Sequence, residues 1–169
     1  MPVLTRQGRK IENMQKTLII IKPDAVQRNL IGSIIKRFED KGLQILGLKM
    51  MRISETVAKQ HYSIHKGKDF YEPLIRYMTS GPVVLMVLKG KNAIEVARKM
   101  MGTTFGADAL PGTIRGDYAV SNRFNLIHGS DSESSAEKEI NTFFTPSELI
   151  EYEAMDLSWI YDTSTGTIV

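Results

Sequence analysis

The run of apolar and β-branched residues at positions 17–21 (Thr-Leu-Ile-Ile-Ile) constrains the fold of this chain more than any other segment. It ends at Lys22-Pro23-Asp24, a combination that favours a turn. A short, continuous apolar run bounded by a turn is typical of a strand that is buried on both faces. We therefore expect residues 17–21 to form a central strand of a sheet, with Lys22 at its end.

Helices and strands are predicted to alternate along the chain after this strand. Apolar residues recur at helical spacing from Ile31 to Phe38, which predicts an amphipathic helix that ends at Lys41-Gly42. The same patterns and the capping residues predict a strand at 43–53, a helix that follows the N-cap Ser54 and runs through about His65, a helix at 71–78, a strand at 83–88 and a helix at 93–101 that ends at Gly102.

The segment at 102–116 is rich in glycine and is predicted to be a long irregular loop, a feature that is usually functional. Residues 118–127 are predicted to form the last strand. A capping-box pair, Ser134 and Glu137, predicts a helix through Phe144, and Thr145-Pro146-Ser147-Glu148 repeats this device. This order predicts an α+β protein with a ferredoxin-like βαββαβ antiparallel four-stranded sheet and helices packed on one face.

Length and composition limit the classes of protein that fit. A chain of 169 residues suits one domain, which we expect at residues 14–161, after a leader at 1–13 and before a tail at 162–169. The absence of cysteine excludes disulfides and thiolate sites and favours a cytoplasmic location. No apolar run approaches the roughly 20 residues of a membrane span. Basic residues do not gather in one tract, so we do not expect a nucleic-acid partner.

One histidine, His128, lies between an apolar run and the turn Gly129-Ser130-Asp131, shortly after the arginine-containing loop at 111–117. Imidazole is nucleophilic near neutral pH, and arginine binds phosphate through paired hydrogen bonds. Glycine-rich phosphate loops are absent, so side chains would have to hold a phosphate. The candidates lie at the ends of predicted elements: Lys22, Arg98, Thr104, Arg115 and His128.

Residues 125–131, Asn-Leu-Ile-His-Gly-Ser-Asp, match the signature Asn-x-x-His-Gly-Ser-Asp, and the chain resembles the nucleoside diphosphate kinase family through them. Further segments at 21–24, 61–62, 80–84, 111–117 and 135–140 resemble the family in the same order. The resemblance implies that the γ-phosphate of a nucleoside triphosphate, typically ATP, passes to a nucleoside diphosphate by a ping-pong mechanism through a phosphohistidine. It also implies broad base specificity, Mg²⁺ on the nucleotide and a homo-oligomer, with a hexamer favoured over a tetramer.

By position, the resemblance implies that His128 is the nucleophile and that Glu139, with Ser130 beside it, orients the imidazole. A carboxylate at one ring nitrogen selects the tautomer that leaves the other nitrogen free to attack. The implied substrate contacts are phosphate ligands at Arg98, Thr104 and Arg115, a ribose and phosphate contact at Lys22, a ribose ligand at Asn125, Tyr62 near the histidine, Phe70 stacked on the base, and Asp131 on magnesium, possibly through water.

Two other readings compete with this one. A catalytically silent ferredoxin-like module that binds nucleotides or nucleic acid would need no nucleophile, and a histidine phosphatase would need arginine where Ile127 stands. Residues 121–124 differ from the family's usual sequence, which affects the expected wall of the base site. His61 and His65 have the spacing of metal ligands on one helix face, but without a third ligand we expect that face to be solvated.

Overall fold

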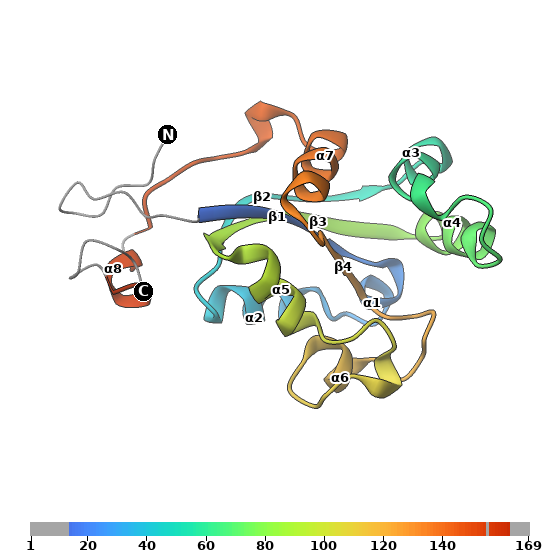
Figure 1. The fold of residues 1–169 in the computed structure, drawn as a ribbon, viewed down its shortest axis with the longest axis horizontal. Coiled ribbons are helices and arrows are strands. Elements are labelled where there is room, and N and C mark those ends of the chain that lie inside the picture. The colour runs from blue at the N-terminus through green and yellow to red at the C-terminus, as the bar shows by residue number, and fades with distance from the viewer. Residues whose placement is uncertain (1–13, 155, 163–169) are drawn as a thin grey trace.

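The computed structural model describes residues 14–154 and 156–162, which contain a four-stranded antiparallel sheet in the order β2-β3-β1-β4 (Figure 1). Strand β3 lies between β1 and β2, so the arrangement is the split βαβ form and confirms the predicted ferredoxin-like sheet. The strands are β1 (Met14–Ile21), β2 (Gln44–Arg52), β3 (Pro82–Lys91) and β4 (Ile127–Gly129).

Helices join the strands in the predicted order, with short additions. The predicted turn after β1 contains a short helix with proline in its first turn. The α-helices are α1 (Pro23–Gln27), α2 (Ile31–Asp40), α3 (Glu55–His61), α4 (Tyr71–Thr79), α5 (Ala93–Met101), α6 (Ile114–Tyr118), α7 (Glu133–Phe143) and α8 (Leu157–Ile160). The 3₁₀ turns are Ser63–His65, Gly106–Asp108 and Pro146–Glu148.

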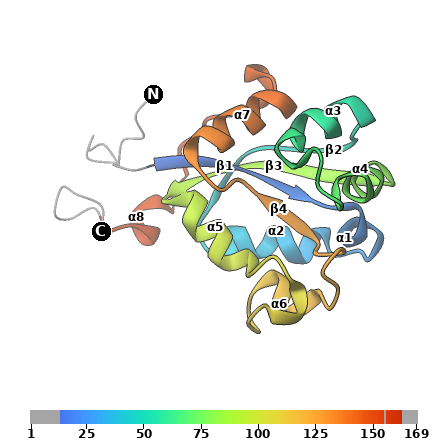
Figure 2. The same ribbon diagram turned by 45° about the vertical axis from the view of Figure 1, so that its right-hand side comes forward.

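The sheet is covered on both faces, so the expectation that helices pack on one face is wrong. Successive side chains of a strand point to opposite faces. Ile19 and Ile21 belong to the core beneath α2 and α5, whereas Leu18 and Ile20 belong to the core beneath α3, α4 and α7 (Figure 2). The central strands are apolar at nearly every position, and a second layer of helices removes their other face from water.

The last strand differs most from its prediction at 118–127, because β4 contains only residues 127–129. The hydroxyl of Ser121 accepts hydrogen bonds from the amides of Arg123 and Phe124, which turns the chain instead of extending it. Leu126 then has a φ of 69°, a left-handed conformation that a strand does not contain. Pairing with β1 begins only at the next residue.

The segment predicted as an irregular loop at 102–116 is partly helical. It contains the 3₁₀ turn at Gly106–Asp108 and the start of α6, which Thr113 caps by accepting a hydrogen bond from the amide of Gly116 at 3.0 Å. The predicted start of α7 was two residues late, because the N-cap is Ser132 and not Ser134. The N-cap at Ser54 and the capping box of Thr145 and Glu148 are confirmed.

The division of the chain into a leader, a domain and a tail stays a prediction. The leader at 1–13 and positions 163–169 of the tail lie outside the described residues. In the part of the chain that the structure describes, no helix is both long and apolar enough to cross a bilayer.

Candidate active site

His128 lies on β4 and is held by a carboxylate from α7. Its partner across the sheet is Ile20 of the central strand, so the backbone of the histidine is supported by the core. Its Nε2 atom lies 3.1 Å from Oε1 of Glu139, and both side chains are largely buried. The histidine is therefore held at one ring nitrogen, by the carboxylate that the resemblance to the family implies.

Ser130 completes this arrangement from the next turn. Its hydroxyl donates to Oε2 of Glu139 at 2.6 Å and accepts from the amide of Leu18 at 3.1 Å. Burial alone would raise the pKa of Glu139, but the hydrogen bonds from His128 and Ser130 outweigh it and lower that pKa. An ionised carboxylate only accepts hydrogen bonds, so in the neutral ring of His128 the hydrogen lies on Nε2 and Nδ1 has the free lone pair.

Lys22 stands at the end of β1, where the sequence placed it. It is buried, and its Nζ donates to Oδ1 of Asn125 at 2.6 Å. Burial, with the positive charge of Arg115 nearby, lowers the pKa of Lys22 to about 8, although Asp24 opposes this shift. The hydrogen-bond partner of this buried ammonium within the described residues is a neutral amide, which leaves the positive charge available to an anionic ligand.

Arg115 ties α6 to the strand that carries the histidine. Its guanidinium donates to the carbonyl oxygens of Asn125 at 3.1 Å, Gly102 at 2.8 Å and Ile127 at 2.7 Å. Burial and the charge of Arg98 lower the pKa of Arg115 to about 10, so the guanidinium remains charged at neutral pH. Three of its five N–H groups donate to other described residues, which leaves two available to a ligand.

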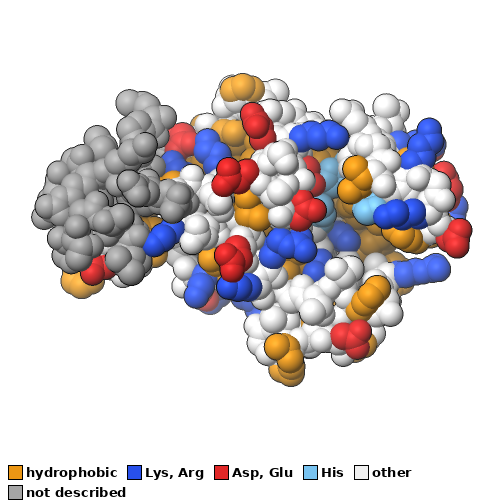
Figure 3. Space-filling model, viewed as in Figure 1, with side chains coloured by type: hydrophobic (Ala, Val, Ile, Leu, Met, Phe, Trp, Pro, Cys, Tyr) orange, Lys and Arg blue, Asp and Glu red, His pale blue; other side chains and the backbone are white. Residues whose placement is uncertain are grey.

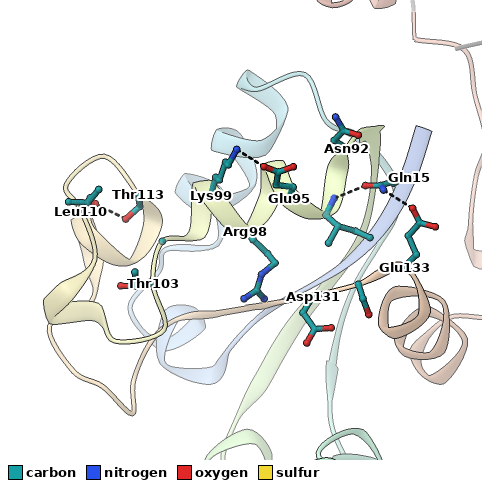
Figure 4. Close-up of a pocket in the computed structure, with 13 residues that line it drawn as sticks. Gln15, Asn92, Glu95, Arg98, Lys99, Thr103, Leu110, Thr113, Asp131 and Glu133 are labelled. Atoms are coloured by element: carbon teal, nitrogen blue, oxygen red, sulfur yellow. Dashed lines mark hydrogen bonds and ion pairs between the residues drawn. The ribbon is translucent and has the colours of Figure 1, made fainter. Parts of the chain in front are cut away.

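Arg98 and Asp131 reach into one hollow of about 730 Å³ from α5 and from the turn after β4 (Figure 4). Arg98 donates to the carbonyl oxygen of Gly129 at 3.4 Å, next to the histidine. A hydrogen bond from Ser135 lowers the pKa of Asp131, so its carboxylate is ionised. His128 does not line this hollow, which is linked to the strand of the histidine by the bond from Arg98 to Gly129.

The other predicted contact residues differ in how deeply they are buried. Tyr62 is buried with its ring 6.3 Å from that of His128, and its hydroxyl has no partner among the described residues. The side chain of Phe70 is exposed at 47%, as a base-stacking surface would be. Thr104 contributes its carbonyl oxygen, which accepts from Nδ2 of Asn125 at 2.9 Å, while its residue is exposed.

His61 does not lie on a solvated helix face, so that prediction is wrong. The chain folds α3 over β4, and the His61 ring centroid lies 4.9 Å from that of His128. Burial lowers the pKa of His61 to about 4, with a further contribution from His128. Helical spacing with His65 gave no sign of this position, because the contact joins residues far apart in the sequence.

Three comparisons with known proteins agree. The sequence model of the family described as "Nucleoside diphosphate kinase" matches residues 15–149. The chain belongs to the nucleoside diphosphate kinase family. A nucleoside diphosphate kinase from Roseiflexus sp. (strain RS-1) is 53% identical over 149 residues, which are 88% of this chain and all of that protein. Nucleoside diphosphate kinase A of Mus musculus is 51% identical over 150 residues, 89% of this chain and 99% of the mouse protein.

The fold agrees as well. The structure of a halophilic nucleoside diphosphate kinase from Halobacterium salinarum in complex with CDP superposes with a TM-score of 0.86 at 46% identity, covering 88% of this chain and 99% of that one. Nucleoside-diphosphate kinase activity is therefore the activity of this chain, and nucleotides are its substrates.

In this member of the nucleoside diphosphate kinase family, the histidines and several lysine and arginine side chains lie beside a hollow between the lobe of α3 and α4 and the lobe of α6 (Figure 3).

The sequence patterns did not indicate two residues near Lys22 and Asn125, which are Asp24 and Tyr77. Asp24 accepts hydrogen bonds from the hydroxyl of Tyr77 and from the amide of Leu126. Asp24 belongs to Lys22-Pro23-Asp24, which predicts a turn and resembles the family, and its carboxylate is the available signal in the sequence.

Proposed function

We propose that His128 carries the phosphate between the two nucleotides. In the first half-reaction, Nδ1 attacks the γ-phosphorus of a nucleoside triphosphate, a P–N bond forms, and the bond to the leaving diphosphate breaks. In the second, an oxygen of another nucleoside diphosphate attacks the phosphohistidine and restores the imidazole. The single observation that carries this proposal is the 3.1 Å contact between Nε2 of His128 and Glu139, because it assigns the hydrogen of the neutral ring to Nε2 and leaves Nδ1 to attack.

The positive side chains around the histidine support a transfer that depends on charge. A loose phosphoryl transition state spreads negative charge over its equatorial oxygens. We propose that Lys22, Arg98 and Arg115 stabilise that charge, since each has donors near β4 that are not all used within the protein. Tyr62, whose hydroxyl has no partner in the described part of the chain, is proposed to lie beside the reacting histidine.

The rest of the nucleotide is proposed to lie along residues that join different elements. Phe70 would stack on the base, and Asn125 and Lys22 would contact the ribose, with Thr104 and Arg98 on the phosphates. The complex of the Halobacterium salinarum relative with CDP supports binding of a nucleoside diphosphate here. Stacking uses the π-face that all bases share, so we propose broad base specificity.

Magnesium is proposed to enter as part of the nucleotide substrate. Mg²⁺ prefers oxygen ligands and keeps several of its waters, so one or two carboxylates suffice beside the phosphates. Asp131 fits this role, because its carboxylate is ionised and partly exposed in the hollow that Arg98 also lines. We propose that Asp131 contacts the hydrated ion through water.

We also propose that the chain forms a homo-oligomer, with a hexamer favoured over a tetramer. Leu48 and Met50 support an assembly, since they expose 51% and 57% of their surface on β2, an edge strand. The molar mass from light scattering tests this proposal. A cytoplasmic location stays a prediction from the absence of cysteine.

Labelling with [γ-³²P]ATP tests the phosphohistidine. The full chain should take up label that is lost in acid, retained in base and transferred to GDP. His128→Ala should take up none, whereas His65→Gln should label normally. Transfer of label through the His128→Ala protein would show that the covalent assignment is wrong.

A further inference from the structure

The side chains of His61, His128 and Glu139 form a cluster of potential metal ligands. Each offers one ligand atom, and these three atoms lie within 4.8 Å of one another. The residues come from α3, β4 and α7, so the cluster exists only in the folded chain. All three side chains are of intermediate burial, which shields the cluster from bulk water without closing it.

His61 is the unexplained member of this cluster. Its Nε2 atom is buried and has no hydrogen-bond partner within the described residues. Its ring is held by edge contacts, with centroids 4.9 Å from His128 and 5.3 Å from Phe143. A buried ring nitrogen without a partner costs free energy, and a ligand that binds nitrogen would remove this cost.

We propose that these three residues bind a divalent transition-metal ion such as zinc. Zinc bonds to imidazole nitrogen and carboxylate oxygen are about 2.0–2.2 Å long, so two tetrahedral ligands lie about 3.3 Å apart. Nε2 of His128 and Oε1 of Glu139 are already 3.1 Å apart. The ion takes the place of the hydrogen between them, His61 approaches as the third ligand, and water fills the fourth position.

The ligand types separate this ion from the magnesium of the substrate. Imidazole suits zinc, copper and nickel, whereas Mg²⁺ requires oxygen ligands in near-ideal octahedral geometry. Two imidazoles and one carboxylate therefore favour the transition metal even where magnesium is more abundant. The resulting site is distinct from the contact proposed for Asp131, which involves only oxygen atoms.

Occupancy of this site inactivates the kinase, a consequence that rests on the proposed function of His128. A metal ion at Nε2 uses the lone pair of that nitrogen, and the ring hydrogen moves to Nδ1. Nδ1 then has no lone pair with which to attack phosphorus, so zinc holds His128 in the tautomer that does not react. The metal acts as a reversible inhibitor.

Titration of the full, nucleotide-free chain with Co²⁺ tests the site without using activity. We expect visible absorption bands of low-coordinate cobalt that saturate at one ion per chain and that zinc abolishes. His61→Gln should weaken cobalt binding at least about 100-fold, the upper end of what loss of an outer-shell partner costs. His65→Gln, the matched control on the same segment, should bind as the wild type does. Absence of saturable bands, or equal binding by His61→Gln, would overturn the proposal.

Phosphorylation at buffered free zinc tests the inhibition. Zinc should abolish labelling of the wild type, and EDTA added with Mg²⁺ in excess should restore it. The factor by which zinc reduces labelling should be at least about 10-fold smaller in His61→Gln. Labelling that zinc leaves unchanged would overturn the inhibitory role. Failure of zinc-free protein to label at His128 with ATP and Mg²⁺ would instead contradict the proposed function, so the two failures are distinguishable. Circular dichroism of each variant checks that it is folded.

Discussion

The carboxylate of Asp24 accepts a hydrogen bond from the amide of Leu126, 3.2 Å away, and holds that residue at a φ of 69°. The amide of Lys22 also donates to the carbonyl oxygen of Leu126 at 2.8 Å. Both contacts join the start of α1 to the turn before β4. They position Asn125 against Lys22 and start β4 at the residue before His128.

Replacement of Leu126 tests whether this turn is strained. The side chain is fully buried, so Leu126→Ala should lower the free energy of unfolding by about 2–5 kcal/mol. Leu126→Gly should be at least as stable as Leu126→Ala, because glycine avoids a left-handed penalty of roughly 1–2 kcal/mol. Urea unfolding measures both. Leu18, buried in the extended β1, is the control, and there alanine should be the more stable substitution.

Asp24→Ala should disturb the turn more than Tyr77→Phe. Alanine has no side-chain acceptor, so the hydroxyl of Tyr77 and the amide of Leu126 both lose the partner that the carboxylate provides. An unsatisfied buried group costs about 1–3 kcal/mol, and we expect kcat/KM to fall about 10-fold. Tyr77→Phe leaves the bond to Leu126 intact. A larger loss in Tyr77→Phe than in Asp24→Ala would contradict the role given to Asp24.

The lowered pKa of Lys22 predicts how stability depends on pH. The folded protein releases this proton near pH 8, whereas the unfolded chain retains it up to about 10.5. The unfolded state therefore binds more protons between these values, and the contribution of Lys22 to the free energy of unfolding rises with pH from about 8. Wild type should gain stability relative to Lys22→Met between pH 7.5 and about 9.5. No difference between the two slopes would mean that Lys22 is not buried as described.

The pair of His128 and Glu139 predicts a specific catalytic defect. In Glu139→Gln the amide can donate to Nε2, which favours the tautomer with hydrogen on Nδ1, so the rate of phosphoenzyme formation should fall on the order of 100-fold or more. Nucleotide affinity should change little, because Glu139 faces the ring and not the substrate. Ser130→Ala removes one of the two bonds to the carboxylate and should have a smaller effect. Single-turnover labelling separates rate from affinity, and an effect confined to affinity would be evidence against tautomer control.

Phe70→Ala tests the proposed base contact. Stacking of a base on an aromatic ring is worth roughly 1–3 kcal/mol, so binding of all nucleotides should weaken about 10-fold or somewhat more with little change in their ranking. Steady-state kinetics with ADP, GDP, CDP and UDP measure this effect. A preference of the wild type for one base above about 1000-fold would mean that polar groups read the base.

Patterns local in the sequence predicted most of the elements. The buried strand at 17–21 and the helix at 93–101 are present, because continuous apolar runs and helical periodicity reflect burial directly. The signature at 125–131 identified His128, Ser130 and Asp131, since one turn brings these residues together. Glu139 was implied by resemblance to the family, and the fold places it against His128.

Long-range contacts account for what the patterns did not predict. The segment 118–126 has the composition of a strand, but Ser121 turns it and Asp24 bonds to Leu126, so pairing begins only at β4. The helical spacing of His61 and His65 predicts a solvated face. Packing of α3 over β4 instead places His61 beside His128.

Residue types and spacing thus specify the strands, the helices and the chemical groups of the site, because these depend on neighbours within a few positions. The partners of Leu126, the burial that lowers the pKa of Lys22 and the cluster of His61, His128 and Glu139 arise between segments distant in the chain. The free energies of these interactions depend on short distances between the residues. Those distances are reached only when the sheet and both helical layers have packed.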